Sequence, residues 1–462
     1  MSHTFTVTSP VNDEIYYEGS YATETEITKA LRNSVAAQGE WQKVPHSVRA
    51  EYCLRLVDAL LQQQERCSEE LSWQMGRPIQ YGPNELSGFA ERARYMIAVA
   101  ESSLQDMAFD DQVGYKRFIR RVPVGVVLAM VPWNYPYLTA VNILIPALMA
   151  GNSVILKPSS QTPLTAERIA NAVTTAGLPQ DVFQYLLLDH EAANRVMVAT
   201  EIDYVAFTGS TSAGRVVEKN IAGRFIEASL ELGGKDPAYV RADAELEFSV
   251  ANLVDGTYFN SGQSCCGIER IYVHKHIYKA FIDAFIAQVE QYRLGNPLHT
   301  DTTLGPMVDP QAVGVVKRQI DDATNKGGKT AIDATLFHPE DIGASYCAPQ
   351  VVLDVDHSMM LMRQESFGPV VGIMSVDDDR KAIALMNDSE FALTASVWTQ
   401  DSATAIELGE QVCCGTWFMN RCDYLDPALA WSGMKNSGKG CSLSQIAYEK
   451  LTRPRSFHLR VT

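Results

Sequence analysis

The chain has 462 residues, 46% of them hydrophobic and 20% charged, so it is an ordinary globular protein too long for a single hydrophobic core. Its 55 acidic residues outnumber its 39 basic residues, which gives a formal net charge of −16 at pH 7. The length therefore predicts two or three domains. The negative charge repels nucleic acids and anionic lipids, so we expect neither a nucleic-acid nor a membrane partner.

The chain begins with segments that predict packing helices. Its first ten residues lack the basic stretch and apolar core of a secretory signal, and no apolar run approaches the roughly 18 residues of a membrane span. Thr23 and Glu26 are placed as a capping box for a helix over residues 23–37. A second helix is predicted over residues 47–66. The apolar faces comprise Ile27, Ala30, Leu31 and Val35 in the first helix and Ala50, Cys53, Leu54, Val57, Leu60 and Leu61 in the second.

Residues 105–122 predict an exposed pair of strands. Basic residues such as Lys116 and Arg120 alternate there with Phe118, a pattern that suits a solvent-facing edge better than a core. An exposed edge needs a pairing partner. Residues 455–461 also alternate polar and apolar side chains.

From residue 124 the pattern becomes an alternation of strands and helices, which predicts the α/β class with parallel sheets. Predicted strands cover residues 124–131, 153–156, 183–188 and 204–207, with helices at 137–150 and 165–176 that end at Gly151 and Gly177. A second series follows Asp243, with a helix to residue 258, a strand at 271–273, a helix at 278–292 and further units to residue 418. Two open α/β domains are therefore expected, with ligands in the crevice between them.

A glycine-containing turn predicts a nucleotide site. The strand ending at Phe207 runs into Gly209 and Gly214, and a helix is expected from about Arg215, so the turn's amide groups can face a pyrophosphate. The spacing is not the usual GxGxxG, and an ordinary tight turn is the alternative. Lys157 directly follows the predicted strand at 153–156, at the edge of the sheet where a phosphate or ribose is expected. The alternative is a solvated surface lysine without a ligand.

Two polar turns contain candidates for chemistry. Cys265 and Cys266 follow Gly262 in a turn that would expose a thiol, the strongest side-chain nucleophile near neutral pH. Either cysteine is a candidate, and a buried structural thiol is the alternative. Glu231 lies 34 residues before Cys265, in a turn with two glycines. The nine cysteines are scattered and lack Cys-x-x-Cys spacing, which indicates a reducing compartment, the cytoplasm, and no structural metal.

Four motifs resemble those of the aldehyde dehydrogenase superfamily and occur in its order. They are Pro132-Trp-Asn-Tyr-Pro136, Glu231-Leu-Gly-Gly-Lys-Asp236, the stretch 260–270 and Glu365-Ser-Phe-Gly-Pro369, and the resemblance covers roughly residues 21–455. It implies two Rossmann-like α/β domains, with residues 1–104 and 123–232 binding the dinucleotide and residues 233–442 forming the catalytic domain. Residues 105–122 and 443–462 would form a β oligomerisation arm, in which the exposed strands of 105–122 pair with residues 455–461. The arm also contacts a neighbouring subunit in the superfamily, which implies a homodimer or homotetramer.

The resemblance also implies the reaction, the oxidation of an aldehyde to its carboxylic acid with NAD(P)+. Cys265 would form a thiohemiacetal and then a thioester, and Asn134 with the Cys265 backbone N–H would stabilise the oxyanion. Glu231 would activate the hydrolytic water, its alternative being an ion pair with Lys235. Because members that transfer the acyl group to coenzyme A do not need this glutamate, a free acid is the expected product.

The resemblance assigns cofactor contacts at the carboxyl edge of the sheet and at the Glu365 motif. The usual pattern after Lys157 is Pro-x-Glu, and the glutamate holds the adenosine ribose; here Ser160 replaces it, so NADP is admissible as well as NAD. The implied cofactor-binding residues are Val131, Pro132, Trp133, Lys157, Ser159, Ser160, Gly209, Ser210, Leu232, Glu365 and Phe367.

The substrate is predicted only as an aldehyde. The pattern is closest to the succinate-semialdehyde dehydrogenase branch, yet Asn142 stands where those enzymes often carry an arginine for the substrate carboxylate. Arg421 is a candidate replacement, with a surface arginine as the alternative, and Ser432 replaces a family glycine without a predicted effect. Succinate-semialdehyde dehydrogenase and a non-catalytic scaffold that keeps the fold are the two alternative functions.

Overall fold

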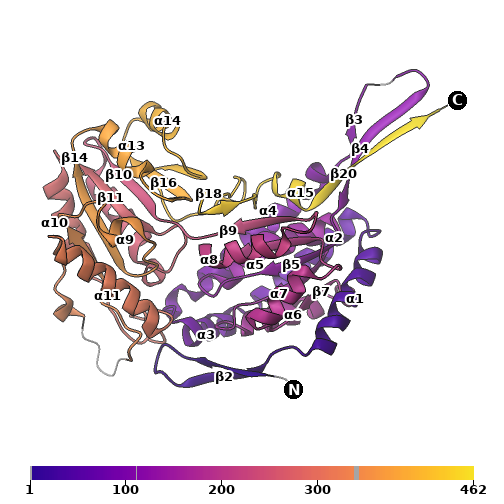
Figure 1. The fold of residues 1–462 in the computed structure, drawn as a ribbon, viewed down its shortest axis with the longest axis horizontal. Helices are drawn as coiled ribbons and strands as arrows, with labels where there is room; N and C mark the ends of the chain where they lie inside the picture. Colours follow the sequence, from indigo (N-terminus) through magenta and orange to yellow (C-terminus); the bar gives the residue numbers. More distant parts are fainter. Residues whose placement is uncertain (1–2, 111, 338–342, 462) are drawn as a thin grey trace.

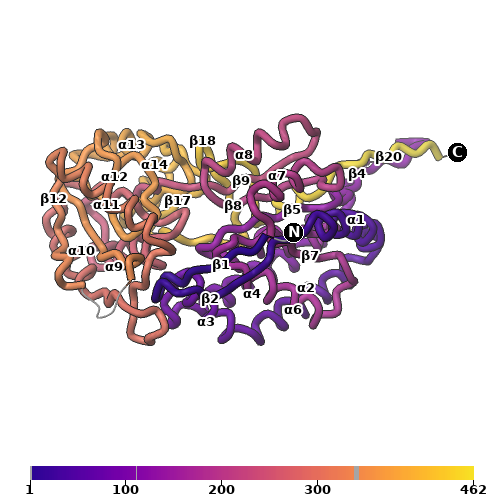
Figure 2. Tube along the Cα trace, turned by 60° about the horizontal axis from the view of Figure 1, so that its bottom comes forward, coloured from indigo at the N-terminus to yellow at the C-terminus, as the bar shows by residue number. Residues whose placement is uncertain are grey.

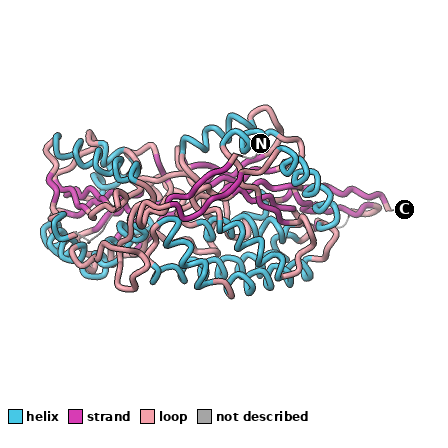
Figure 3. Tube along the Cα trace, turned by 90° about the horizontal axis from the view of Figure 1, so that it is seen from below, coloured by secondary structure: helices cyan, strands magenta, loops and turns pink. Residues whose placement is uncertain are grey.

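The computed structural model describes residues 3–110, 112–337 and 343–461, which form two lobes and a projecting arm (Figure 1). One lobe is built on a six-stranded sheet and the other on a seven-stranded sheet. Strands run through the middle of both lobes with helices on either side (Figure 3). The α/β architecture that the sequence predicts is therefore confirmed.

The six-stranded sheet has the order β19-β9-β8-β5-β6-β7. All neighbours are parallel except β19, which is antiparallel to β9. The four strands predicted between residues 124 and 207 are present, and the third is shorter than expected. The bounds are Val126–Met130 (β5), Ser153–Lys157 (β6), Phe183–Tyr185 (β7), Tyr204–Thr208 (β8), Glu227–Glu231 (β9) and Gly438–Lys439 (β19).

Helices cover both faces of this sheet because its parallel strands are apolar on both sides. In β5, Val127 and Ala129 pack into one core while Val126 and Leu128 pack into the other. The first core is covered by α2 (His46–Leu61), α3 (Gln64–Met75), α4 (Gly82–Leu104), α5 (Pro136–Ala150) and α6 (Leu164–Thr175). The second is covered by α1 (Glu24–Trp41), α7 (His190–Val198) and α8 (Thr211–Ile221).

The seven-stranded sheet has the order β12-β13-β14-β11-β10-β16-β17, parallel except where β12 meets β13. Its strands are Asp236–Val240 (β10), Ile268–His274 (β11), Lys329–Thr330 (β12), Gln350–Leu353 (β13), Val370–Val376 (β14), Thr394–Trp398 (β16) and Thr416–Met419 (β17). One face packs against α9 (Leu246–Tyr258) and α10 (Tyr278–Val289). The other packs against α11 (Pro310–Asn325), α12 (Met360–Arg363), α13 (Asp379–Asn387) and α14 (Ser402–Gly409).

The arm is a three-stranded antiparallel sheet that projects from the first lobe (Figure 1). Its strands are β3 (Met107–Ala108), β4 (Tyr115–Pro123) and β20 (Thr452–Arg460). The register runs from Thr452 opposite Pro123 to Arg460 opposite Tyr115, with the rings of Phe118 and Phe457 stacked at 4.5 Å. The predicted pairing of the two exposed segments is confirmed, although residue 111 lies outside the described part of the chain.

The first predicted helix is confirmed with its capping box, but the second prediction is wrong in extent. Residues 47–66 belong to two helices, because α2 ends at Leu61 and α3 begins at Gln64. Two apolar positions assigned to packing faces, Val35 and Leu54, are 46% and 40% exposed. The apolar face predicted from spacing alone is therefore wider than the face that α1 and α2 actually bury.

Helix α8 begins four residues earlier than the glycine pattern predicts. Ser210 is its N-cap and accepts a hydrogen bond from the Ala213 amide at 3.3 Å, so Gly214 already lies inside the helix. The predicted turn therefore shrinks to Gly209 and Ser210. The amide groups available to an anion are those of the first helical turn, which carries the positive end of the helix dipole.

An N-terminal hairpin, β1 (Thr4–Thr8) with β2 (Ile15–Ser20), runs along the outside of the first lobe toward the second (Figure 2). The Tyr346 hydroxyl donates to the Val11 carbonyl at 3.2 Å and ties the hairpin's turn to the second lobe. A short pair, β15 (Phe391–Ala392) with β18 (Met434–Lys435), leads back to the first sheet. Within the described ranges, every helix is too short or too polar to cross a membrane.

Candidate active site

The site lies at the carboxyl edge of the six-stranded sheet. Strands β5, β6, β8 and β9 end side by side there, which places Lys157, Thr208 and Glu231 along one edge. From β5 the chain continues outward through β6 and β7, and then crosses to the opposite side for β8 and β9. Such a reversal of strand order opens a crevice at the carboxyl ends, where open α/β sheets bind ligands.

The loop before the cysteines is held in an unusual backbone conformation. Asn260 and Ser261 have φ angles of 54° and 57°, in the left-handed region that non-glycine residues seldom adopt. Gly262 follows at +70°, and a Cβ there would lie 2.3 Å from the Gly368 carbonyl oxygen. The Ser261 hydroxyl donates to the Gly305 carbonyl at 2.8 Å. The loop is thus tied to neighbouring segments and presents the cysteines in one orientation.

The two adjacent cysteines have different surroundings. Cys265 is partly exposed, whereas Cys266 is 2% exposed and donates to the Asp423 carboxylate at 3.0 Å. Contact with the Cys265 thiol, burial and the Asp423 charge raise the pKa of Cys266 well above its usual value. Cys266 therefore stays a thiol at neutral pH, and Cys265 is the accessible member of the pair.

Asn134 is buried next to this loop. Its side-chain amide donates to the Gln263 carbonyl at 3.1 Å, two residues before Cys265. Arg77 donates to the Asn134 main-chain carbonyl and forms a buried ion pair with Glu85. Glu85 in turn accepts the Tyr137 amide at 2.7 Å, at the start of α5. Two segments far apart in the sequence thus hold the Asn134 turn against the cysteine loop.

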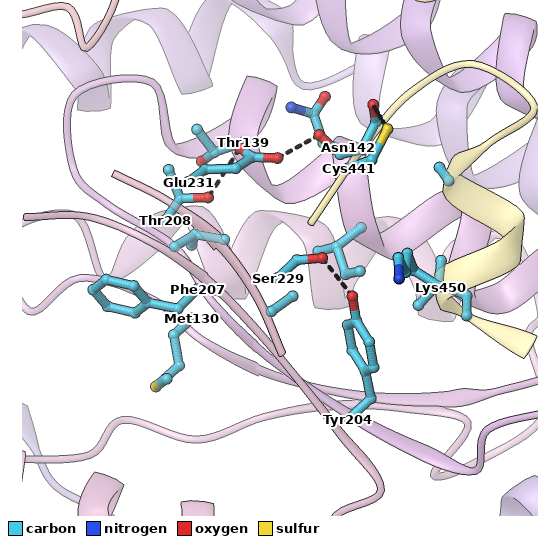
Figure 4. Close-up of a pocket in the computed structure, with 16 residues that line it drawn as sticks. Met130, Thr139, Asn142, Tyr204, Phe207, Thr208, Ser229, Glu231, Cys441 and Lys450 are labelled. Carbon is cyan, nitrogen blue, oxygen red and sulfur yellow. Dashed lines mark hydrogen bonds between the residues drawn. The ribbon is translucent and has the colours of Figure 1, made fainter. Parts of the chain in front are cut away.

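Glu231 is the last residue of β9, and it faces a cavity that Asn142 also lines (Figure 4). Ser442 belongs to the lining of the same cavity. The Glu231 carboxylate accepts hydrogen bonds from the hydroxyl groups of Ser442 and Thr208, the latter at 3.2 Å. Burial raises the pKa of Glu231, and the two hydrogen bonds and the Arg92 charge oppose this shift without cancelling it. A carboxyl group with a raised pKa is suited to accept a proton near neutral pH.

Two glycines after Glu231 let three motifs meet. A Cβ on Gly233 would lie 2.3 Å from the Glu365 carboxylate, and one on Gly234 would lie 2.3 Å from the Cys265 carbonyl. The Gly234 amide donates to Glu365 at 3.1 Å. Burial, followed by the charge of Glu269, raises the pKa of Glu365 to about 8.

A buried ion pair orients the Glu365 motif. Lys235 donates to Glu269 at 2.5 Å and to the Ser366 hydroxyl at 3.0 Å. Glu269 also accepts the backbone amides of Ser366 and Phe367. The predicted alternative, in which Lys235 pairs with Glu231, is wrong, because Lys235 points away to Glu269. The network sets the Phe367 ring edge-on to Trp133, with centroids 5.7 Å apart.

The residues at this edge fit a dinucleotide. Lys157 is largely buried, burial lowers its pKa, and its ammonium has no hydrogen-bond acceptor or carboxylate partner among the described residues. A buried cation without a partner requires an anion or several hydroxyl groups. Beyond it, Ser159 accepts the Gln161 amide at 3.2 Å and Ser160 lies 3.5 Å from the Tyr21 hydroxyl, so no carboxylate takes part in these contacts.

The remaining predicted cofactor positions lie along the same edge. Val131 donates its amide to the Lys157 carbonyl at 3.1 Å and leads into Pro132. Gly209 donates to the Glu231 carbonyl at 3.0 Å, and Ser210 is exposed at the start of α8. Leu232 donates to the Ser437 carbonyl at 3.0 Å and packs against Gly214. The predicted set is therefore gathered around one crevice.

Several residues of the site escape sequence analysis. Arg77, Glu85 and Arg92 come from the segment between residues 67 and 104, for which no helix was predicted, and Glu269 and Ser442 have no local signal of their role. The one sequence signal that could have found Arg77, Glu85 and Arg92 is a charged side chain within an otherwise apolar helical segment. Arg421 is exposed and lies over the Tyr424 ring, and Trp431, beside Ser432, pairs with Ser442. Among the described residues, no three His, Cys, Asp or Glu side chains could hold a metal.

Comparison with known proteins gives one consistent result. A family model described as "Aldehyde dehydrogenase family" matches residues 1–457. The chain is 32% identical to geranial dehydrogenase of Castellaniella defragrans, over 91% of this chain and 87% of that protein. It is 34% identical to succinate-semialdehyde dehydrogenase [NADP(+)] of Mycolicibacterium paratuberculosis, over 86% and 84%. The crystal structure of PnpE with nicotinamide adenine dinucleotide superposes with a TM-score of 0.94 at 28% identity, covering 99% of this chain and 94% of that one.

Proposed function

Because the chain belongs to the aldehyde dehydrogenase family and is an NAD(P)-dependent aldehyde dehydrogenase, we propose that Cys265 is its nucleophile and Glu231 its general base. The observation that carries these roles is the contrast between the two cysteines. Cys265 is partly exposed, whereas Cys266 is buried and bonded to Asp423. A thiol must be reachable and ionisable to attack a carbonyl carbon.

In this proposal the Cys265 thiolate attacks the aldehyde carbon and forms a thiohemiacetal. The Asn134 amide and the Cys265 backbone N–H donate to the oxygen as its negative charge develops, and each such donor contributes roughly 3 kcal/mol. NAD(P)+, when bound, supplies the acceptor for the hydride that leaves this carbon. Asn134 already uses one N–H on Gln263, which leaves its second N–H for the oxyanion.

Glu231 then acts on the thioester. Its carboxylate takes a proton from water, the resulting hydroxide attacks the thioester carbon, and Cys265 leaves as thiolate when the acid is released. The hydroxyl groups of Ser442 and Thr208 orient the carboxylate. The product is the free carboxylic acid, so added coenzyme A should leave turnover unchanged.

The cofactor and domain roles follow the same assignment. Lys157, Ser159 and Ser160 would hold the adenosine ribose or its 2′-phosphate, and Ser210 the pyrophosphate. Glu365 and Phe367 would bind the nicotinamide ribose and ring, with Trp133 opposite Phe367. Residues 1–104 and 123–232 would be the dinucleotide-binding domain and residues 233–442 the catalytic domain.

The arm of residues 105–122 and 443–462 would join subunits into a homodimer or homotetramer. Met107, Phe109 and Val113 are 49%, 50% and 100% exposed there, and a second subunit that covered them would remove apolar surface from water. Sedimentation velocity at micromolar concentration tests this, because a monomer would contradict it. The nine free cysteines support a cytoplasmic location.

The catalytic roles are tested by three variants with NAD+ or NADP+ and butanal. Cys265→Ser should lose at least about a thousandfold in turnover, whereas Cys266→Ser should keep most of it. Glu231→Gln should release about one equivalent of reduced cofactor per site and then stop, because the thioester forms but is not hydrolysed. Full activity of Cys265→Ser, or a Glu231→Gln variant without a burst, would contradict the assignment.

A further inference from the structure

Arg92 is a buried cation beside the proposed chemistry. It lies in α4 and is 8% exposed, and its Nη1 donates to the Leu138 carbonyl at 3.0 Å and to Asn142 Oδ1 at 3.2 Å. Asn142 lines the same cavity as Glu231 (Figure 4). The guanidinium therefore reaches the wall of this cavity from a helix that carries none of the four motifs.

Arg92 has unused hydrogen-bonding capacity. Of the four other buried arginines in the described part of the chain, Arg77 and Arg168 are each paired with a glutamate, whereas Arg49 and Arg270, like Arg92, have no carboxylate within 4 Å. The Nε and Nη2 of Arg92 have no acceptor there, yet neither is among the fully buried unpaired nitrogen atoms. These two donors therefore still reach solvent-accessible space.

The thiols of Cys265 and Cys266 and the buried carboxylates of Glu231 and Asp423 lie close enough to act electrostatically on Arg92. Burial lowers the pKa of Arg92, and its neighbours Cys266, Glu231, Cys265 and Glu91 oppose this shift. Arginine remains a cation even when its pKa is lowered. A second anion that approaches the ionised Glu231 would be repelled unless a fixed cation offset its charge.

We propose that Arg92 binds a carboxylate on the substrate, at the end opposite the aldehyde, and that the preferred substrates are short aldehydes with such a terminal carboxylate. A guanidinium with two adjacent free N–H donors matches the two oxygens of a carboxylate. Asn142 fixes the side chain through Nη1 and leaves Nε and Nη2 for the ligand. The inference rests on the proposed function, because it requires the aldehyde carbon to lie at Cys265.

The test compares two aldehydes of equal chain length, 4-oxobutanoate and butanal, in the full-length enzyme. Wild type should favour 4-oxobutanoate in kcat/KM, and Arg92→Met should lower that preference on the order of 100-fold, mainly through KM. Arg92→Lys keeps the charge without the two-pronged donor and should lose less. Arg94→Met is the matched control, because Arg94 lies on the same helix but is 53% exposed and paired with Asp58.

Each outcome decides the inference. A preference that falls in Arg92→Met, falls less in Arg92→Lys and is unchanged in Arg94→Met supports it. Equal losses for both aldehydes in Arg92→Met would assign Arg92 to the thiolate or the oxyanion and overturn it, as would a wild type that favours butanal. Butanal turnover that depends on Cys265 tests the proposed function separately, so either conclusion can fail alone. If Arg92→Met does not fold, the Arg92→Lys ratio decides.

Discussion

The side-chain amide of Asn134 donates to the main-chain carbonyl of Gln263 at 3.1 Å, which fastens the turn after β5 to the loop that presents Cys265. The two residues are 129 positions apart in the chain. Any movement of one segment therefore changes the distance between the proposed oxyanion donor and the thiol. This contact makes Asn134 both a donor and a structural tie.

The two roles of Asn134 can be separated. We expect Asn134→Ala to lower kcat by about 100- to 1000-fold, because one oxyanion donor is lost. The rate at which iodoacetamide alkylates Cys265 should change little, since alkylation forms no oxyanion. An alkylation rate that falls with kcat would instead mean that the loop has moved. Asn252→Ala, which removes a solvent-exposed hydrogen bond on α9, is the control for the chemistry of the substitution.

A hydrogen bond from Ser442 should tune the pH dependence of the reaction. Glu231 acts as a base only when ionised, so thioester hydrolysis should fall as the pH drops through its raised pKa. Ser442→Ala removes a donor that favours the charged form, which should move this acid limb of the kcat profile to higher pH. Ser229→Ala is the control, because Ser229 lines the same cavity but bonds Tyr204. A limb that stays in place would argue against Glu231 as the titrating base.

The residues proposed to react could be predicted from the sequence, but the residues that hold them in place could not. Cys265, Glu231 and Asn134 lie in short turns whose glycines and polar residues are visible locally. Arg92 and Ser442 reach the site only through tertiary packing, and nothing near them in sequence marks the contact. Strands were predicted better than helix ends for a related reason. Buried β-branched runs are a local signal, whereas the start of α8 depends on Ser210 acting as a cap.

Glu365 should make stability depend on pH. Its pKa is raised to about 8 in the folded protein, compared with 4.5 for a free glutamate, so the folded state binds more protons than the unfolded chain between these values. This contribution to stability is fully present below about pH 4.5 and is lost as the pH rises through 8. Glu365→Gln cannot lose a proton. We therefore expect the free energy of unfolding of Glu365→Gln, relative to that of wild type, to increase as the pH rises from 5 to 9, by at most about 5 kcal/mol.

Urea denaturation at pH 5, 7 and 9 checks this prediction. Glu365→Gln keeps the size of the side chain and an oxygen that can accept the Gly234 amide, so packing should change little. Glu410→Gln, at the exposed C-cap of α14, is the surface control for the exchange of glutamate for glutamine. A constant difference between Glu365→Gln and wild type at all three pH values would contradict a raised pKa for Glu365.

Ser160 should control the choice between the two cofactors. It lies at the carboxyl end of β6 near Lys157, whose ammonium has no carboxylate partner among the described residues. Ser160→Glu would place a negative charge where a 2′-phosphate is proposed to bind. We expect kcat/KM for NADP+ to fall by about 100-fold, because the charges repel one another and the carboxylate also neutralises Lys157. The value for NAD+ should stay within about threefold or rise, since a carboxylate can accept both ribose hydroxyl groups.

The measurement is kcat/KM for each cofactor at a fixed, saturating aldehyde concentration and at two ionic strengths. Ser160→Gln is the matched control, because it has the size of glutamate without the charge. If Ser160→Gln lowers the NADP+ value as much as Ser160→Glu does, side-chain bulk rather than charge would be responsible. If the NADP+ effect is electrostatic, it should weaken at high salt, because ions screen an exposed charge more than a buried one. A wild type that prefers NAD+ by more than about a hundredfold, or about 2.7 kcal/mol, would remove the reason for assigning Ser160 to a 2′-phosphate.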